Sequence, residues 1–458
     1  MRTTLSLSPI FKKHQNNLVE SYSQFLGELR EDIEEGHQSD TLSLEFQEEF
    51  KIIISNSVLD EYDPLKFYWL NLIDRLIELI EVFEEGHIES TGELIAAFSD
   101  SDLLGFVVEQ LESGNEAEVV MEQVLELQEI QIISFFHLHL SQEDWIPEGP
   151  VGYRLVSELG EGSGHLFLGK NKAHFFISEF VNENIIPICS YSPQKGEIQI
   201  FHNQEVKKLS ITEAPMLRID DILCLPGIKN KSHNLSTEHF EKLQWAYNTI
   251  KNTLPELYSF LNKFTSTVIP LYQEELVSFS MEVLPSYSSI NMDNRDRIDL
   301  IDDLLHENGH HFLNFLLEGE EEIIFEDDDK IFYSPWRKSL RPIRGIFHGM
   351  ATFYWAYRVF KELSFLQDIE SFFTSEEISK IYFRFLEESI LLKYCYLECN
   401  RAFKLEKISP FGMEIINTIY EEIKEDKKLE EAINCKLKPE LIEELNRIEL
   451  DIKKNLTV

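Results

Sequence analysis

The stretch DDLLHENGHHFLNFL, residues 302 to 316, contains an HExxH pentapeptide that begins at His306 and ends at His310. Leucine and phenylalanine recur around it at three- and four-residue spacing, which predicts an amphipathic helix. Side chains four positions apart project from the same face of a helix, so the two imidazoles can bind one metal ion. The stretch therefore predicts a packed, metal-binding helix in the second half of the chain.

The residues around the pentapeptide favour this helix. Three aspartates precede it, and their charges stabilise a helix N-terminus through the helix dipole. One of them, Asp302, lies one turn before His306 and is expected to accept a hydrogen bond from its ring. Gly309 costs about 1 kcal/mol relative to Ala inside a helix, so we expect another segment's backbone to pass close to it. His311 is expected to point away from the pair, either as a packing residue or as a residue that supports a metal ligand.

A catalytic metal usually has three protein ligands. The metzincin extension needs Gly and His at positions 313 and 316, but these hold Leu313 and Leu316, which excludes it. The best third ligand is His348, early in the apolar stretch RPIRGIFHGMATFYWAYRVF and between two glycines that should let two helices approach closely. Glu362 is the alternative that a zinc peptidase would use.

A basic cluster separates the two histidine segments: Arg337, Arg341 and Arg344 lie within eight residues. Guanidinium groups bind carboxylates through two parallel hydrogen bonds. A peptidase does not need them, whereas 2-oxoglutarate chelates a metal through two oxygens and presents its distal carboxylate to a cation. Three histidines on octahedral iron would leave room for the keto acid and for O2. The alternative is that the arginines neutralise acidic residues 327–329.

The composition narrows the range of partners. The chain has 458 residues and a formal net charge of −40, from 82 acidic and 42 basic residues. Such a charge repels nucleic acids and anionic membranes. Five scattered cysteines favour reduced thiols in a cytoplasm over a disulfide framework. The first residues lack the apolar region of a signal peptide, and no apolar run approaches the roughly 20 residues that span a bilayer.

The hydrophobic pattern predicts a predominantly helical α+β protein in three segments. Residues 1–140 form a helical N-terminal region, and residues 141–236 contain short strand-like runs such as KAHFFISEFV and GEIQIFHN. Residues 237–458 return to helical periodicity and form the HExxH metal-binding domain. The β-rich segment could recruit a peptide by strand addition.

The segment LLHENGHHFLNFLL, followed by YSPWRKSLRPIRGIFHGMATFYWAYRV, resembles the HExxH motif-containing peptide-modification family over about residues 265–365. That family's members are understood as iron- and 2-oxoglutarate-dependent peptide β-hydroxylases in the biosynthesis of ribosomally made, modified peptides. The resemblance implies that His306, His310 and His348 bind Fe(II), and that Arg337 and Arg341 contact the keto acid. The link between these arginines differs from the commonest form, which is shorter and contains Asp, so which arginine binds stays open.

The sequence thus predicts an enzyme that hydroxylates a β-carbon of a precursor peptide, with Glu307 as an acid/base or orienting group. Two alternatives stay open: a zinc metallopeptidase with Glu307 as general base, and a non-catalytic peptide-binding protein. We expect a cytoplasmic protein without nucleic-acid or membrane partners. The sequence leaves its oligomeric state open.

Overall fold

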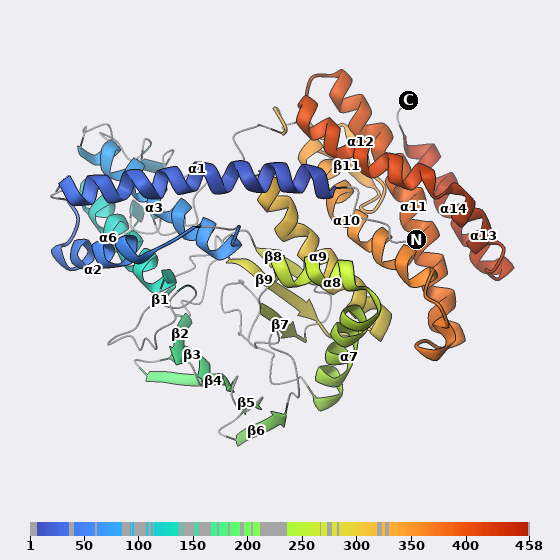
Figure 1. Cartoon of the computed structure of the whole chain (residues 1–458), viewed down its shortest axis with the longest axis horizontal. Coiled ribbons are helices and arrows are strands. Elements are labelled where there is room, and N and C mark those ends of the chain that lie inside the picture. The colour runs from blue at the N-terminus through green and yellow to red at the C-terminus, as the bar shows by residue number, and fades with distance from the viewer. Residues whose placement is uncertain are drawn as a thin grey trace. The chain divides into compact units, whose positions relative to one another are not determined.

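A computed structural model shows a predominantly helical α+β protein, as the sequence predicts (Figure 1). The structure describes residues 7–35, 41–59, 62–84, 114–136, 236–265, 267–272, 277–281, 284–317, 323–325 and 329–456. It also describes the strands between residues 152 and 210 and short pieces between 92 and 112. The chain forms two compact units.

The first unit to be described comprises Asn16–Leu235 and Thr267–Glu275. Its helices are most of α1 (Ser8–Glu35), α2 (Leu44–Asn56), α3 (Pro64–Glu84) and α6 (Ala117–Phe135). Helices α3 and α6 pack against each other, and the buried indole of Trp69 donates a hydrogen bond to the carbonyl oxygen of Ile132 at 3.1 Å. Ser43 caps α2 by accepting a hydrogen bond from the Phe46 amide.

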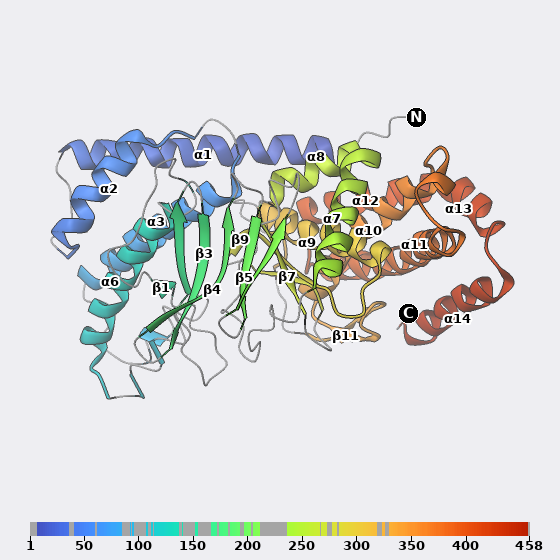
Figure 2. The ribbon, with the colours of Figure 1, turned by 90° about the horizontal axis from the view of Figure 1, so that it is seen from below.

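The same unit contains a six-stranded antiparallel sheet whose strands follow one another in chain order (Figure 2). The strands are β1 (Gly152–Tyr153), β2 (Leu166–Asn171), β3 (His174–Val181), β4 (Asn184–Ser192), β5 (Glu197–His202) and β6 (Glu205–Ser210). The register shifts between residues 177 and 178, where β3 pairs with β4. The unit also holds β7 (Thr267–Leu271). The β-rich middle segment is therefore confirmed.

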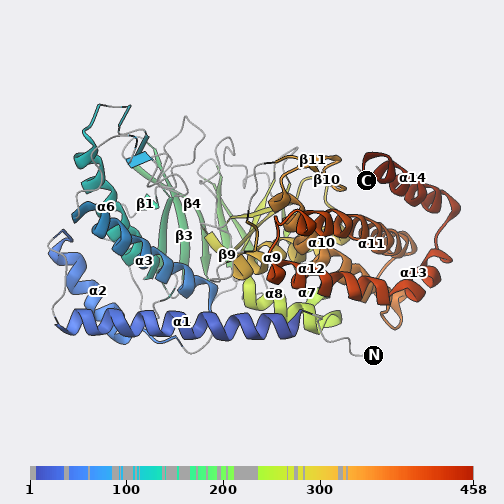
Figure 3. The ribbon, with the colours of Figure 1, turned by 90° about the horizontal axis from the view of Figure 1, so that it is seen from above.

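The second unit comprises Met1–Gln15, Ser236–Ser266 and Leu276–Val458. Its helices are α7 (Thr237–Thr253), α8 (Pro255–Phe264), α9 (Arg297–Leu317), α10 (Ile343–Ser364), α11 (Ser375–Lys404), α12 (Pro410–Glu425), α13 (Lys427–Asn434) and α14 (Pro439–Asn455), with a 3-10 turn at Ile369–Ser371. The strands β8 (Phe279–Met281) and β9 (Leu284–Asn291) are antiparallel, and β10 (Phe332–Ser334) forms a hairpin with β11 (Ser339–Arg341). Helix α10 packs against both α9 and α11 (Figure 3).

Aromatic side chains hold α9 against α10. The indole of Trp355 stacks on Phe260 with ring centroids 3.8 Å apart and meets Phe312 edge-on at 5.4 Å. Gly309 makes this possible, because a Cβ there would lie 2.4 Å from Trp355 Cδ1. The expectation that a backbone passes close to Gly309 is corrected, since its close neighbour is a side chain.

The glycines around the third histidine have a different role from the expected one. A Cβ on Gly349 would lie 3.2 Å from the indole of Trp336, and one on Gly345 would lie 3.6 Å from Cβ of Arg341. Both neighbours belong to the segment that precedes α10 and not to α9. Gly349 therefore accommodates Trp336 of the arginine-bearing segment, Gly345 leaves room for a methyl group, and Gly309 accommodates the helix contact.

The two units do not coincide with the three expected segments. The expected change after residue 236 lies beside the change of unit between Leu235 and Ser236, whereas the N-terminal helical region and the β-rich segment fall mainly in one unit. Among the described helices, none has the length and apolar character that crossing a membrane requires.

Candidate metal centre

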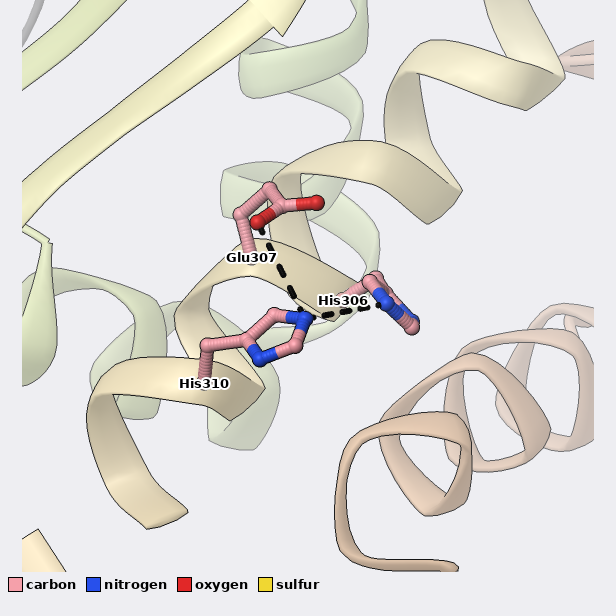
Figure 4. Close-up of side chains that lie close together, drawn as sticks. All are labelled: His306, Glu307 and His310. Atoms are coloured by element: carbon pink, nitrogen blue, oxygen red, sulfur yellow. Dashed lines mark hydrogen bonds and ion pairs between the residues drawn. The ribbon is translucent and has the colours of Figure 1, made fainter. Parts of the chain in front are cut away.

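Helix α9 places the two histidines of the pentapeptide on one face. Their Nε2 atoms lie 3.3 Å apart and their ring centroids 5.0 Å apart. Figure 4 shows His306 and Glu307 on either side of the ring nitrogen of His310. The sequence spacing of four residues thus brings both imidazoles to one point.

His348 on α10 supplies a third imidazole. Its Nε2 lies 2.5 Å from Nδ1 of His310, and the two ring centroids are 4.5 Å apart. His310 therefore has one ring nitrogen against each of the other two histidines. The structure places the three histidines in contact, but His348 faces the opposite ring nitrogen of His310 from His306, and the group whose ligand atoms all lie within 4.8 Å of one another comprises His306, Glu307 and His310.

The chemistry of this cluster fits a metal ion. Burial lowers the pKa of His306 to about 4, and burial together with the charge of Arg344 lowers the pKa of His348 to about 4. Burial and the neighbouring His306 lower the pKa of His310 well below its usual value. All three are neutral near pH 7, so their nitrogen lone pairs are available to a cation, and imidazole suits iron and zinc. The His310 side chain keeps 24% of its exposure, which leaves solvent access.

Glu307 is buried beside the same cluster. Its carboxyl accepts a hydrogen bond from Ser280 Oγ at 3.1 Å, and its Oε2 lies 4.0 Å from His310 Nε2. Burial and the neighbouring Asp303 raise the pKa of Glu307 to about 8. In the metal-free protein Glu307 is therefore a neutral acid at pH 7, and its contact with His310 is not an ion pair.

Asp302 does not make the expected hydrogen bond. Its Oδ2 accepts from Arg384 Nη2 at 2.6 Å, and its buried Oδ1 has no hydrogen-bond partner among the described residues. Its charge nevertheless acts on His306, because it raises the pKa of that imidazole against the larger effect of burial. Asp302 thus joins α9 to α11 and keeps one oxygen available near the cluster.

The remaining polar residues of the motif hold the other face of α9. His311 is buried, and its Nε2 lies 3.2 Å from Ser288 Oγ on β9. The side-chain oxygen of Asn308 accepts a hydrogen bond from Thr265 at 2.8 Å. These contacts agree with the expectation that His311 is a packing residue, and they fix the rotation of α9 about its axis.

The three arginines are exposed on the segment that runs from the turn after β10 into the first turn of α10. Arg337 lies in the hairpin turn, Arg341 ends β11 and Arg344 lies in the first turn of α10. The charge of Arg337 contributes to the lowered pKa values of His306 and His310. Arg344 does the same for His348. The positive charges of Arg337 and Arg344 therefore act on the imidazoles of the histidine cluster.

The alternative partners for these arginines are only partly described. Asp329 forms an ion pair with Lys407 at 3.3 Å and not with an arginine. Residues 327 and 328 lie outside the described part of the chain. The structure therefore gives no described acid to which Arg337 or Arg341 is paired.

Glu362, the ligand that a zinc peptidase would use, is not near the cluster. It follows His348 by 14 residues on α10, which corresponds to about 21 Å along a helix. Its carboxylate pairs with Arg358 at 2.5 Å, in a buried network that also contains Glu422. That network stabilises the far end of α10.

Sequence reasoning missed the residues that support the cluster. Trp336 stacks on Phe353 with centroids 4.3 Å apart, and Phe353 meets His306 at 4.5 Å. Trp336 also donates a hydrogen bond to Glu388 at 2.9 Å. The tryptophan stands beside Arg337 in the PWR segment, and this adjacency is the signal that could have pointed to it.

The chain matches no protein-family model and no curated protein sequence.

Proposed function

We propose that this protein is an Fe(II)- and 2-oxoglutarate-dependent oxygenase that hydroxylates a β-carbon in a ribosomally made precursor peptide. One observation carries the proposal: imidazoles that come from two helices and are neutral near pH 7 are in contact, and the charges of Arg337 and Arg344 act on them. A metal site flanked by cations suits a cofactor that is both a chelator and a dicarboxylate. The resemblance of the HExxH and PWR segments supports the same activity.

Each group has a definite task in this proposal. His306, His310 and His348 would hold Fe(II), and their low pKa values keep them unprotonated below neutral pH. When bound, Fe(II) and 2-oxoglutarate would supply oxygen-activation chemistry, in which one atom of O2 goes into the substrate C–H bond and the other into succinate as CO2 is lost. The arginine segment binds the distal carboxylate of the keto acid. Because Glu307 is a neutral acid, it can donate a hydrogen bond toward the cluster.

The described sheet offers a route for peptide recruitment. The end strand β6 (Glu205–Ser210) pairs with β5 on one side only within the described sheet. Such an edge can hydrogen-bond an extended peptide by strand addition. Cys435 is an exposed free thiol, which suits the reducing cytoplasm that we propose for this enzyme.

The decisive test is anaerobic loading with Fe(II), addition of 2-oxoglutarate and exposure to O2 with the precursor peptide encoded beside the gene. We expect stoichiometric succinate and a peptide mass gain of one oxygen atom. The His348→Ala variant, matched for expression and folding, should give neither product. An iron-loaded wild-type protein that forms no succinate with this peptide would contradict the proposal.

A zinc metallopeptidase is the second candidate, and one observation favours it. A carboxylate oxygen of Glu307 and one nitrogen each of His306 and His310 all lie within 4.8 Å of one another. Glu307 could then activate a water molecule as general base. This candidate predicts peptide cleavage that needs zinc, ignores 2-oxoglutarate and disappears in Glu307→Gln.

A further inference from the structure

Trp336 is in contact with three parts of the candidate site. Its indole stacks on Phe353 at an interplanar angle of 8°, and Phe353 in turn packs on His306. The ring also covers Gly349, beside His348, where a Cβ would be only 3.2 Å away. Arg337 follows directly in the chain. One indole therefore packs on the residue that contacts His306 and on the residue that follows His348, and it directly precedes Arg337.

A buried polar chain connects this indole to α9. Trp336 Nε1 donates to Glu388 Oε2 at 2.9 Å, and Glu388 Oε1 pairs with Arg384 Nη2 at 3.0 Å. The same Nη2 pairs with Asp302 Oδ2 at 2.6 Å. Helix α11 thus supplies the two middle members, while the arginine segment and the HExxH helix supply the ends.

The cost of burying this chain indicates that it has a role beyond packing. Glu388 is fully buried, and burial raises its pKa to about 8 despite the opposing charge of Arg384. A buried chain of polar and ionic groups often contributes no more stability than apolar side chains of the same volume, and its best-attested benefit is a fixed arrangement. Such a chain suits a site that must hold two segments in one geometry.

We propose that Trp336, Glu388, Arg384 and Asp302 form a positioning chain that fixes the arginine segment against the HExxH helix and ends at the Asp302 carboxylate, one helical turn before His306. The catalytic consequence rests on the proposed function, whereas the arrangement itself does not. None of the four is a metal ligand in this proposal.

Among the described contacts, the Asp302 end makes no hydrogen bond to His306, but its charge acts on that ring. Its Oδ1 is buried without a described hydrogen-bond partner, and the residue lies one turn before His306. His306 presents Nε2 to His310, so its Nδ1 is the nitrogen left to carry the proton. The negative charge of Asp302 favours a protonated Nδ1, and substitutions of carboxylates that act on a ligand histidine typically weaken metal binding 10- to 100-fold.

The chain offers a matched control. Glu387 also pairs with Arg384, at 2.9 Å through Nη1, but it contacts neither Trp336 nor the histidines in the described contacts. We would compare Asp302→Asn, Trp336→Phe and Glu387→Gln with the wild-type full chain. Asp302→Asn keeps the side-chain size but can turn its amide N–H toward His306. Trp336→Phe keeps a ring on Phe353 but removes the hydrogen bond to Glu388.

The first measurement needs no metal. Long-range proton–nitrogen NMR spectra of the metal-free protein should show His306 in the single Nδ1–H tautomer in wild type and Glu387→Gln, and in mixed tautomers in Asp302→Asn. The same tautomer in wild type and Asp302→Asn would overturn the proposal, even if the protein never binds iron. Thermal unfolding of each variant identifies any general loss of folding.

The second measurement uses Co(II) alone and then Co(II) with 2-oxoglutarate. We expect Asp302→Asn to weaken Co(II) binding roughly 10-fold or more and to alter its visible spectrum. Trp336→Phe should weaken 2-oxoglutarate binding several-fold more than Co(II) binding, and Glu387→Gln should change neither. If Glu387→Gln weakened Co(II) and 2-oxoglutarate binding as much as the other two variants, Arg384 would have only a structural role and the proposal would be overturned. A wild-type protein that binds no metal would instead refute the proposed function.

Discussion

Trp355 Cδ1 lies 2.4 Å from the point where a Cβ would project from Gly309. The indole of Trp355 on α10 therefore occupies the space that the side chain of any other amino acid at position 309 would need. Gly309 lies between the two candidate ligand histidines of α9 and faces α10, the helix that carries His348. The close approach of α9 and α10 therefore depends on a missing side chain inside the motif itself.

Replacing this glycine should separate the helices. Gly309→Ala gains about 1 kcal/mol of helix propensity, but overpacking a core costs roughly 1–3 kcal/mol. We expect a net loss of up to about 2 kcal/mol in the free energy of unfolding and weaker metal binding. Gly345→Ala is the control, because the nearest atom to its Cβ is 3.6 Å away. Chemical denaturation checks both, and a Gly309→Ala protein as stable as the control would contradict the packing argument.

His348→Ala tests whether three imidazoles, and not two, bind the metal. The variant keeps the HExxH pair at 3.3 Å but removes the ligand on α10. Because a catalytic metal usually needs three protein ligands, we expect at least a 100-fold weaker metal affinity by competition with a chelator. His311→Ala serves as the comparison, since that ring contacts Ser288 on the other face of α9. Equal affinity in wild type and His348→Ala would exclude His348 as a ligand.

Substitution with glutamine shows how much each of the three arginines contributes to 2-oxoglutarate binding. Because the charges of Arg337 and Arg344 act on the imidazoles, we expect Arg337→Gln and Arg344→Gln to raise the Kd for 2-oxoglutarate about 10-fold or more. Arg341→Gln, at the end of β11, should have a smaller effect. Metal affinity should change little in all three. Calorimetric titration of the metal-free protein with metal gives the metal affinity, and titration of the metal-loaded protein with 2-oxoglutarate gives its Kd. A larger effect of Arg341→Gln than of the other two substitutions would contradict this order.

The histidine cluster should make the metal-free protein sensitive to acid. His306 and His348 have pKa values of about 4 in the folded state against an ordinary value of 6.5. The unfolded chain therefore takes up protons first, and the stability that these groups contribute is present above pH 6.5 and lost as the pH falls toward 4. Each imidazole should cost up to roughly 2 kcal/mol of unfolding free energy at pH 5.

Comparison with a variant isolates this effect from other groups. Glu307 has a raised pKa of about 8, so its contribution works in the opposite direction and is lost as the pH rises from about 4.5 to 8. Urea unfolding of wild type and His348→Gln at pH 7 and pH 5 should show a smaller pH dependence in the variant. The same pH dependence in both would mean that His348 is not buried in a neutral form.

Glu307→Gln separates the two candidate activities. The folded protein already holds Glu307 as a neutral acid at pH 7, and glutamine is nearly isosteric with it. We therefore expect a folded variant whose metal affinity stays within a few-fold of wild type and which still converts 2-oxoglutarate to succinate. A peptidase would lose its activity, because it needs this carboxylate as a base. Assays for succinate and for peptide cleavage in Glu307→Gln distinguish the oxygenase from the peptidase.

Local patterns in the sequence were enough to predict several features. The four-residue spacing of His306 and His310 and the apolar periodicity around them predicted α9, because both follow from the geometry of one helix. Composition and periodicity also predicted the predominantly helical α+β class. His348 could be singled out because it stood in a second apolar helix after a basic segment.

Only the tertiary structure decided how the separate segments meet. No local pattern shows that Trp355 fills the space at Gly309, that Asp302 pairs with Arg384, or that Glu388 holds Trp336. Each of these contacts joins residues tens of positions apart, and the partner depends on how whole helices pack. The sequence by itself determined which side chains one helix presents on one face. The packing of α10 and α11 determined which of them are desolvated, paired and in contact with residues of other helices, because burial and distance are properties of the folded chain.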